Sequence, residues 1–277
     1  FWKILDQRLE LCRDMCELRY NKLRGVKANV APILWQHGGI ARLNHDDDIL
    51  KAVDERGFTV TIGYSGLYET VKYLTGESHT SPKGFALARQ IMKHLLDKCE
   101  EFKKRSPHLR IALYGTPAES TAGWFNHKLL KQFGEIKDIT DKGFITNSYH
   151  VDVREEIDAF SKIVIESELQ KYSTGGAVSY IETNNMQKNT AALMQVVQFI
   201  YEKIIYAEIN FECDVCGKCK YTGVMENDPE TLHWVCPQCG NDDQNTLSVV
   251  RRTCGYLGET IWTEGRVLDI INRVKHL

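Results

Sequence analysis

Apolar residues recur every three to four positions in several stretches of the chain, a spacing typical of amphipathic helices. Residues 1–24 are the clearest case, with one face formed by Leu5, Leu9, Cys12 and Cys16. Further helices are expected at about residues 83–104, 157–169 and 190–204, after residues 115–120, and at the end of the chain. Runs of β-branched and apolar residues predict strands at 58–62, 109–114 and 177–181. Because strands and helices alternate, the pattern favours an α/β fold with a largely parallel sheet.

The pattern changes after residue 205. Residues 206–245 contain five of the nine cysteines, with many turn residues and few apolar ones. Residues 246–277 contain a short apolar run, a glycine-rich loop and a last helical stretch. We therefore expect three parts: an α/β part over 1–205, a small cysteine-rich domain over 206–245 and a terminal segment over 246–277.

The composition is ordinary for a soluble protein and excludes several classes of function. The net charge of the 277 residues is −2, so nucleic acid and anionic membranes exert no general attraction. No apolar run approaches the about 18 residues of a membrane span, and residues 1–20 do not resemble a signal peptide. Nine cysteines without a secretory signal indicate a reducing, cytoplasmic compartment. The chain begins at Phe1 inside a helical pattern, which suggests a piece of a longer protein.

Two Cys-x2-Cys pairs in the cysteine-rich part predict a structural zinc site. Cys213 with Cys216 and Cys236 with Cys239 are separated by nineteen residues, a spacing found in four-thiolate zinc ribbons. Cys219 offers an alternative, because Cys216 with Cys219 has the same spacing. We favour Cys213 because Gly217 follows its pair as Gly240 follows Cys239, and glycine permits a tight turn around the metal. Eight acidic residues against two lysines in residues 206–245 argue against nucleic-acid binding.

A glycine-rich loop lies about twenty residues from the end of the chain. Its sequence is Arg251-Arg-Thr-Cys-Gly-Tyr-Leu-Gly258, which by composition alone indicates a tight surface turn. The Arg-Thr-Cys-Gly-Tyr form, however, resembles the radical-bearing loop of anaerobic (class III) ribonucleoside-triphosphate reductases, members of the glycyl radical enzymes. That family also has a four-cysteine site just before the loop. Residues 114–120, 146–150 and 175–182 are similar to segments of the family's catalytic barrel.

The resemblance implies a fold, an activity and partners. The chain would contain the second half of a glycyl-radical-enzyme α/β barrel, a zinc ribbon and a radical loop that inserts into the barrel. Gly255 would store a radical generated by an iron–sulfur activating enzyme that uses S-adenosylmethionine. A cysteine outside this chain would become the thiyl that takes hydrogen from the ribose 3′ carbon of the ribonucleoside triphosphate. The complete enzyme would be a homodimer, and this chain would be inactive without the N-terminal half.

The same resemblance implies a substrate site. Thr116, Pro117, Ala118, Glu119 and Ser120 resemble the family's loop for the substrate phosphates, where hydroxyl groups and the N–H groups at a helix start suit an anion. The residues alone favour a different interpretation, a capping box with Pro117 first in the helix and Glu119 at its third position. The further substrate-cavity candidates are Tyr149 and His150.

Two rival functions remain open at this point. Another glycyl radical enzyme would act on a small carbon substrate, but it would leave the ribbon and residues 115–120 without a role. A non-catalytic protein, either a zinc-ribbon interaction module or a spare part that carries the radical, would need no barrel half upstream.

Overall fold

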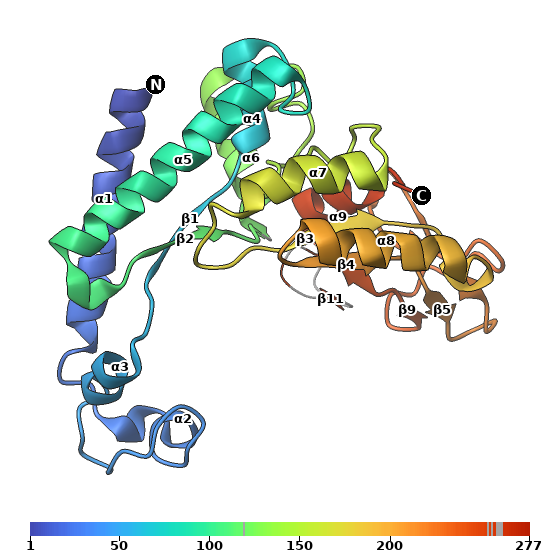
Figure 1. Ribbon diagram of the computed structural model, residues 1–277. Coiled ribbons are helices and arrows are strands. Elements are labelled where there is room, and N and C mark those ends of the chain that lie inside the picture. Colours follow the sequence, from blue (N-terminus) through green and yellow to red (C-terminus); the bar gives the residue numbers. More distant parts are fainter. Residues whose placement is uncertain (119, 254, 256, 259–262) are drawn as a thin grey trace. The chain divides into compact units, whose positions relative to one another are not determined.

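The computed structural model describes residues 1–118, 120–253, 255, 257–258 and 263–277, and these fold as two compact units (Figure 1). The first unit contains Phe1–Gly63, Lys93–Tyr114 and Tyr172–Gly175. The second contains Tyr64–Met92, Gly115–Lys171 and Gly176–Leu277. None of the helices in the described residues is long and apolar enough to cross a membrane.

The first unit combines helices with a pair of short strands. Its helices are α1 (Trp2–Leu23), α2 (Pro32–Trp35), α3 (Leu50–Arg56) and the second half of α5 (Pro82–Arg105), with 3-10 turns at Ala28–Val30 and Pro107–Leu109. Strand β1 (Thr61–Tyr64) pairs with β2 (Ala112–Gly115). The predicted helix at the start of the chain is confirmed by α1, which buries Leu9, Cys16 and Tyr20. Its predicted apolar face is only partly correct, because Leu5 is half-buried and Cys12 is exposed.

Both strands of the first unit begin later than the sequence predicts. Phe58 donates its backbone N–H to Val53 (3.2 Å) and thus ends α3, after Gly57 has turned the chain with φ +72°. Leu109 belongs to a 3-10 turn, and Arg110 follows in the left-handed region with φ +47°. Helix and turn ends therefore occupy the first residues of both predicted strands.

The second unit has a parallel strand pair covered by helices. Strand β3 (Ser179–Glu182) runs parallel to β4 (Ala207–Asn210), with Ser179 opposite Ala207. Helices α7 (Ala159–Gln170) and α8 (Thr190–Lys203) lie side by side over this pair (Figure 1). Their shared core consists of Ala159, Ile163, Ile181, Val196 and Ile204. The predicted helices at 157–169 and 190–204 and the strand at 177–181 are confirmed to within two residues. Helix α4 (Leu67–Thr75) and the start of α5 also belong to this unit.

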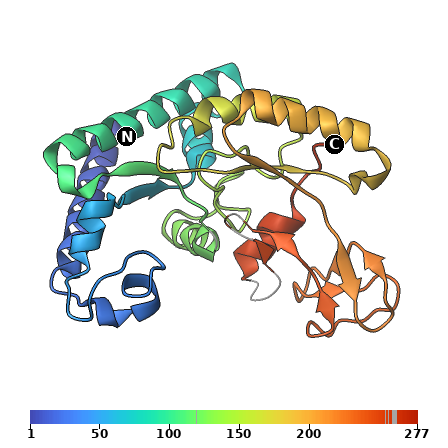
Figure 2. The same cartoon turned by 60° about the horizontal axis from the view of Figure 1, so that its bottom comes forward.

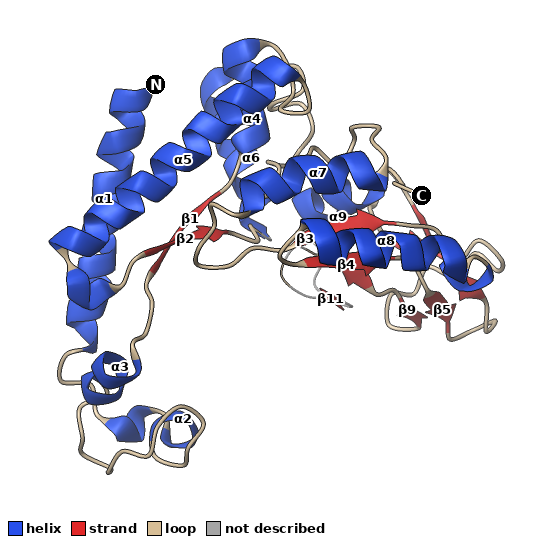
Figure 3. Ribbon diagram, in the orientation of Figure 1, coloured by secondary structure: helices blue, strands red, loops and turns tan. Residues whose placement is uncertain are grey.

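Short antiparallel strands follow β4, drawn as small red arrows in Figure 3. Strand β5 (Asp214–Cys216) lies between β6 (Thr222–Gly223) and β9 (Leu247–Ser248), while β7 (Glu226–Asn227) pairs with β8 (Trp234–Val235). They enclose a core of Cys216, Met225, Trp234, Cys236, Leu247, Val249 and Ile270. Figure 2 shows them gathered at one end of the second unit, beside the terminal hairpin and helix. This hairpin pairs β10 (Arg251–Arg252) with β11 (Leu257–Gly258), and helix α9 (Glu264–Ile271) follows it.

Helices α6 (Ser120–Phe133) and α9 cross at a contact formed by glycines. A Cβ atom built on Gly265 would lie 2.5 Å from the Cα atom of Gly123 and 3.2 Å from the carbonyl oxygen of Gly143. All these neighbours are backbone atoms, which cannot move aside as a side chain can. The crossing therefore joins the helix that follows the predicted phosphate loop to the helix that follows the predicted radical loop.

Gly265→Ala is expected to force the two helices apart. Overpacking of this kind costs about 1–3 kcal/mol. The change from glycine to alanine in a helix contributes at most about 1 kcal/mol through helix propensity, so the variant should be less stable. Urea denaturation should measure a lower free energy of unfolding. Glu264→Gln changes an exposed neighbour on the same helix and should stay within about 0.5 kcal/mol of the wild type. A Gly265→Ala protein as stable as the wild type would contradict the close crossing.

Candidate functional site

Four cysteines of the second unit bring their sulfur atoms together. The Sγ atoms of Cys216, Cys219, Cys236 and Cys239 all lie within 4.8 Å of one another. Cys216 is 3.8 Å from Cys239, and Cys219 is 3.6 Å from Cys236, measured between sulfurs. Sulfurs bound to one zinc at about 2.3 Å in a tetrahedron lie about 3.8 Å apart. The four thiol groups therefore fit a zinc ion.

The cluster contains Cys219 in place of Cys213, so the ligand choice made from the sequence is wrong in this structure. Cys216 accepts at its backbone carbonyl from Lys220 N–H (2.9 Å), just as Cys236 accepts from Gly240 N–H (2.9 Å). Lys220 and Gly240 both adopt the left-handed conformation, with φ +63° and +67°. The two turns are thus equivalent. The expectation that glycine must follow the second cysteine failed because a lysine takes this conformation here.

Hydrogen bonds to the Cys216 sulfur favour the thiolate form that metals bind, whereas the pKa of the Cys219 thiol is raised beside the other three sulfurs. The backbone N–H groups of Cys219 and Lys218 point at Cys216 and lower the pKa of its thiol to about 6. The Nδ2 atom of Asn241 lies 3.7 Å from the same sulfur. Four protein ligands leave no open position for catalysis, so a metal bound here would be structural.

Gly255 lies in the bend between β10 and β11 and is exposed. Arg251 is opposite Gly258 and Arg252 is opposite Leu257 in the hairpin register. Cys254 and Tyr256, the immediate neighbours of Gly255, lie outside the described residues. The sequence pattern that resembles the radical loop is thus carried by the end of a β-hairpin.

Ion pairs fix the first strand of this hairpin. Arg251 is buried and donates both Nη atoms to the carboxylate of Asp214 on β5, with Nη2 2.6 Å from Oδ2. Its guanidinium also lies over the Trp234 ring, 4.9 Å from the ring centre. Arg252 pairs with Glu208 on β4 at 2.5 Å. Because Asp214 is two residues before Cys216, the cysteine cluster and the hairpin share one strand as a support.

The predicted phosphate segment precedes α6, and its residues 116–118 have no regular secondary structure. Thr116 and Pro117 are half-buried, Ala118 is buried and Ser120 begins the helix, while Glu119 lies outside the described residues. The backbone N–H of Ala118 donates to Asn147 Oδ1 at 2.8 Å, so this N–H is not available to an anion. Pro117 is not helical, and the capping-box interpretation is therefore wrong.

Tyr149 and His150 pack in the interior of the second unit. The Tyr149 hydroxyl lies 3.0 Å from Ser179 Oγ and accepts from Gln170 Nε2 at 3.0 Å. His150 Nε2 is 2.7 Å from the Val178 carbonyl, and burial lowers the pKa of its imidazole. His150 borders a cavity of about 10 Å³, room for about one water. Contact of either side chain with substrate stays a prediction.

A family sequence model described as "Anaerobic ribonucleoside-triphosphate reductase" matches residues 1–276 of this chain. The chain belongs to that family. The reductase of Escherichia coli (strain K12) is 36% identical over the whole of this chain, which covers 39% of that protein. The reductase of Enterobacteria phage T4 is 35% identical, again over the whole chain and over 44% of its own length. The chain thus spans about two fifths of these relatives.

Solved structures show the same fold relationship. A structure named "Anaerobic ribonucleotide reductase" matches 98% of this chain and 41% of its own with a TM-score of 0.63 at 19% identity. The Thermotoga maritima enzyme in complex with dATP and CTP matches 91% of this chain and 39% of its own, with a TM-score of 0.53 at 19% identity. The mixture of helices and strands agrees with the expected α/β class, while the half-barrel stays a prediction.

Several buried residues of this reductase-family chain were missed by the sequence analysis. Lys142 is 1% exposed and contacts Asp152, Thr146 Oγ1 (2.7 Å) and Glu69 Oε1 (2.6 Å). These contacts hold the chain on either side of residues 146–150, the segment that resembles part of the family's barrel. Lys142 and Glu69 lie 142 − 69 = 73 residues apart, so no local pattern could have indicated their contact.

Proposed function

We propose that this chain is the C-terminal part of an anaerobic ribonucleoside-triphosphate reductase and that Gly255 stores its radical. The supporting observation is the position of Gly255 in the bend of a hairpin anchored to a four-cysteine cluster, in a chain that matches the family over 1–276. The complete enzyme would reduce ribonucleoside triphosphates to deoxyribonucleoside triphosphates. We expect it to be a homodimer.

Glycine suits radical storage for a physical reason. Loss of one Cα hydrogen leaves a planar centre that is delocalised over the two flanking peptide groups, and a Cβ atom would crowd that plane. An iron–sulfur activating enzyme that uses S-adenosylmethionine would remove the hydrogen. The radical would then pass to a cysteine outside this chain, whose thiyl takes hydrogen from the ribose 3′ carbon. Gly255 is exposed here, so the N-terminal part of the enzyme would have to cover it.

A zinc ion held by Cys216, Cys219, Cys236 and Cys239 would stabilise the position of the hairpin. The metal would fix the two turns of the ribbon and, through them, strand β5. Asp214 on this strand holds Arg251 at the base of the hairpin. The contact between Asp214 and Arg251 would then determine where the bend of the hairpin lies.

Thr116 and Ser120 are proposed to bind the substrate phosphates. Ser120 is exposed at the N-terminus of α6, a helix of 14 residues, where hydroxyl and N–H groups attract anions. In the complete enzyme, Thr116→Ala and Ser120→Ala should raise the KM for nucleotide about tenfold or more, since each removes a hydrogen bond to a charged oxygen worth about 1.5–3 kcal/mol. Initial rates across nucleotide concentrations measure this effect. Lower thermal stability with an unchanged KM would assign both residues to the fold instead.

The proposed activity can be tested with the complete enzyme under anaerobic conditions. After incubation with its activating enzyme, S-adenosylmethionine and a reductant, it should convert a ribonucleoside triphosphate to the deoxyribonucleoside triphosphate, detected by chromatography. A radical without deoxynucleotide formation would favour a different glycyl radical enzyme. The absence of both would favour a non-catalytic zinc-ribbon protein.

A further inference from the structure

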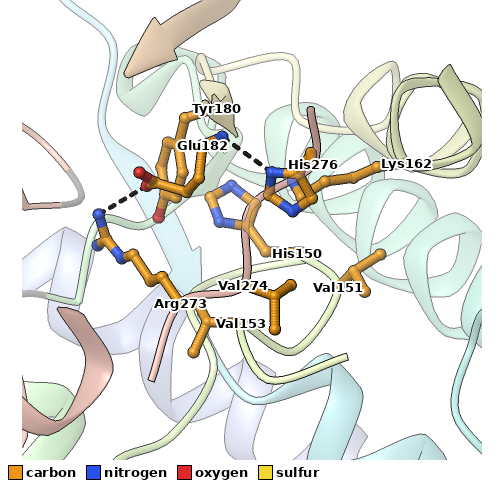
Figure 4. Close-up of a pocket in the computed structure, with 9 residues that line it drawn as sticks. All are labelled: His150, Val151, Val153, Lys162, Tyr180, Glu182, Arg273, Val274 and His276. Carbon is orange, nitrogen blue, oxygen red and sulfur yellow. Dashed lines mark hydrogen bonds and ion pairs between the residues drawn. The ribbon is translucent and has the colours of Figure 1, made fainter. Parts of the chain in front are cut away.

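The last residues of the chain are fixed along strand β3. The backbone N–H of His276 donates to the Glu182 carbonyl at 2.8 Å, and its ring Nδ1 accepts from the Glu182 N–H at 2.8 Å (Figure 4). The His276 carbonyl accepts from Ala159 N–H at 3.2 Å, at the start of α7. Burial lowers the pKa of this imidazole to about 3, so the ring stays neutral and Nδ1 can accept. The tail is therefore a fixed support.

Arg273, three residues earlier, places its guanidinium inside this support. The side chain is only 5% exposed. Its Nε and Nη2 atoms donate to Asp269 Oδ1 at 3.0 and 2.7 Å. Its Nη1 atom donates to Glu182 Oε1 at 2.9 Å, a contact drawn in Figure 4. Nη1 also donates to the backbone carbonyl of Arg252 at 2.7 Å. One planar group thus connects α9, β3 and the first strand of the hairpin.

We propose that Arg273 is a positioning residue for the radical at Gly255, acting by holding the carbonyl of Arg252. This inference rests on the proposed function, which makes Gly255 the radical carrier. Gly255 follows Arg252 by three residues, so a displaced carbonyl moves the strand that leads to it. Hydrogen transfer to and from Gly255 requires close approach of a partner, and a misplacement of about 1 Å can cost about a hundredfold in rate.

The contact differs in kind from the other two anchors of the hairpin. Asp214 and Glu208 hold the side chains of Arg251 and Arg252, so they act on the backbone of the strand only through those side chains. Of these three contacts, that of Arg273 is the one made to the main chain. Lysine cannot replace it, because an ammonium group lacks the planar fork that reaches two carboxylates and a carbonyl together.

The decisive variant is Arg273→Lys in the complete enzyme. It keeps the positive charge between two buried carboxylates, which favours folding. Spin per chain after anaerobic activation, measured by paramagnetic resonance, and kcat should each fall about tenfold or more, as expected for the loss of one charge-assisted hydrogen bond. The KM for nucleotide and the zinc content should stay close to the wild type, and the melting temperature should fall by only a few degrees.

Lys275→Gln is the matched control. Lys275 lies on the same tail and pairs with Glu212 at 2.7 Å. This ion pair does not involve the hairpin. This variant should retain the wild-type spin per chain and kcat. Arg273→Lys with wild-type spin and kcat overturns the proposal, and so does a loss of spin that merely parallels a loss of zinc or of melting temperature.

A second readout separates this inference from the proposed function. In the protein before activation, hydrogen exchange of residues 250–253 should be faster in Arg273→Lys than in Lys275→Gln, while the ribbon residues 214–223 stay unchanged. Equal exchange in the two variants overturns the positioning role. If the wild type forms no radical but the exchange differs as expected, the proposed function fails and the contact between Arg273 and the hairpin stands.

Discussion

Gly255→Ala is expected to abolish the radical of the complete, activated enzyme. The wild type should show a doublet in the anaerobic paramagnetic resonance spectrum, because the unpaired electron couples to the single remaining α-hydrogen. Alanine has a Cβ atom that crowds the planar centre, and its radical would not give this doublet. Zinc content should change little, since Gly255 lies outside the cysteine cluster.

Exposure to oxygen provides an independent measurement on the same proteins. Oxygen adds to the Cα atom of a glycyl radical and breaks the backbone there, which would release 277 − 254 = 23 residues counting Gly255. Mass spectrometry of the wild type should find a shortened chain that ends at residue 254 and a released segment whose first group is a blocked remnant of Gly255. Gly255→Ala should remain intact in air.

Two neighbouring changes serve as controls. Gly258→Ala, in β11, should leave the cleavage position unchanged. Cys254→Ser tests whether the adjacent thiol carries the radical instead, in which case the signal would be lost with this variant. A doublet that survives Gly255→Ala, or cleavage at another residue, would remove the radical assignment and leave a zinc-binding member of the family.

Local sequence pattern predicted the helices well because each has an apolar face that follows the helical period. Helices α1, α5, α7 and α8 all agree with the pattern to within two residues. The starts of β1 and β2 were missed, because Gly57 and Arg110 adopt left-handed conformations that delay each strand. Such conformations depend on tertiary context at a single residue, which periodicity does not register.

The candidate site was predictable in kind and not in detail. The Cys-x2-Cys spacing indicates four thiolates, but three spaced cysteines before Tyr221 allow two pairings. The choice depended on Lys220, whose left-handed backbone is stabilised by its N–H bond to Cys216 and by an Nζ bond to the Gly217 carbonyl (2.8 Å). The contacts of Arg273 with Glu182 and Arg252 had no local sequence signal, since these residues lie 91 and 21 positions away.

Cys219→Ser is expected to remove most of the zinc from the protein, whereas Cys213→Ser should retain about one ion per chain. Cys219 contributes a sulfur to the cluster, 3.6 Å from that of Cys236. Cys213 is exposed and lies outside the cluster. Elemental analysis of the two purified variants measures the difference directly.

The loss of zinc should also affect the hairpin formed by β10 and β11. Zinc binding contributes about 10–16 kcal/mol to the folding of small zinc domains, so a ribbon with three ligands should loosen. Strand β5 would then no longer hold Asp214 against Arg251, and an unpaired buried arginine costs about 3–5 kcal/mol. Limited proteolysis should therefore cut Cys219→Ser faster near residues 250–253 than Cys213→Ser. If Cys213→Ser instead loses the metal and Cys219→Ser keeps it, the ligand set is the one favoured by the glycine positions, and the hairpin must be supported in another way.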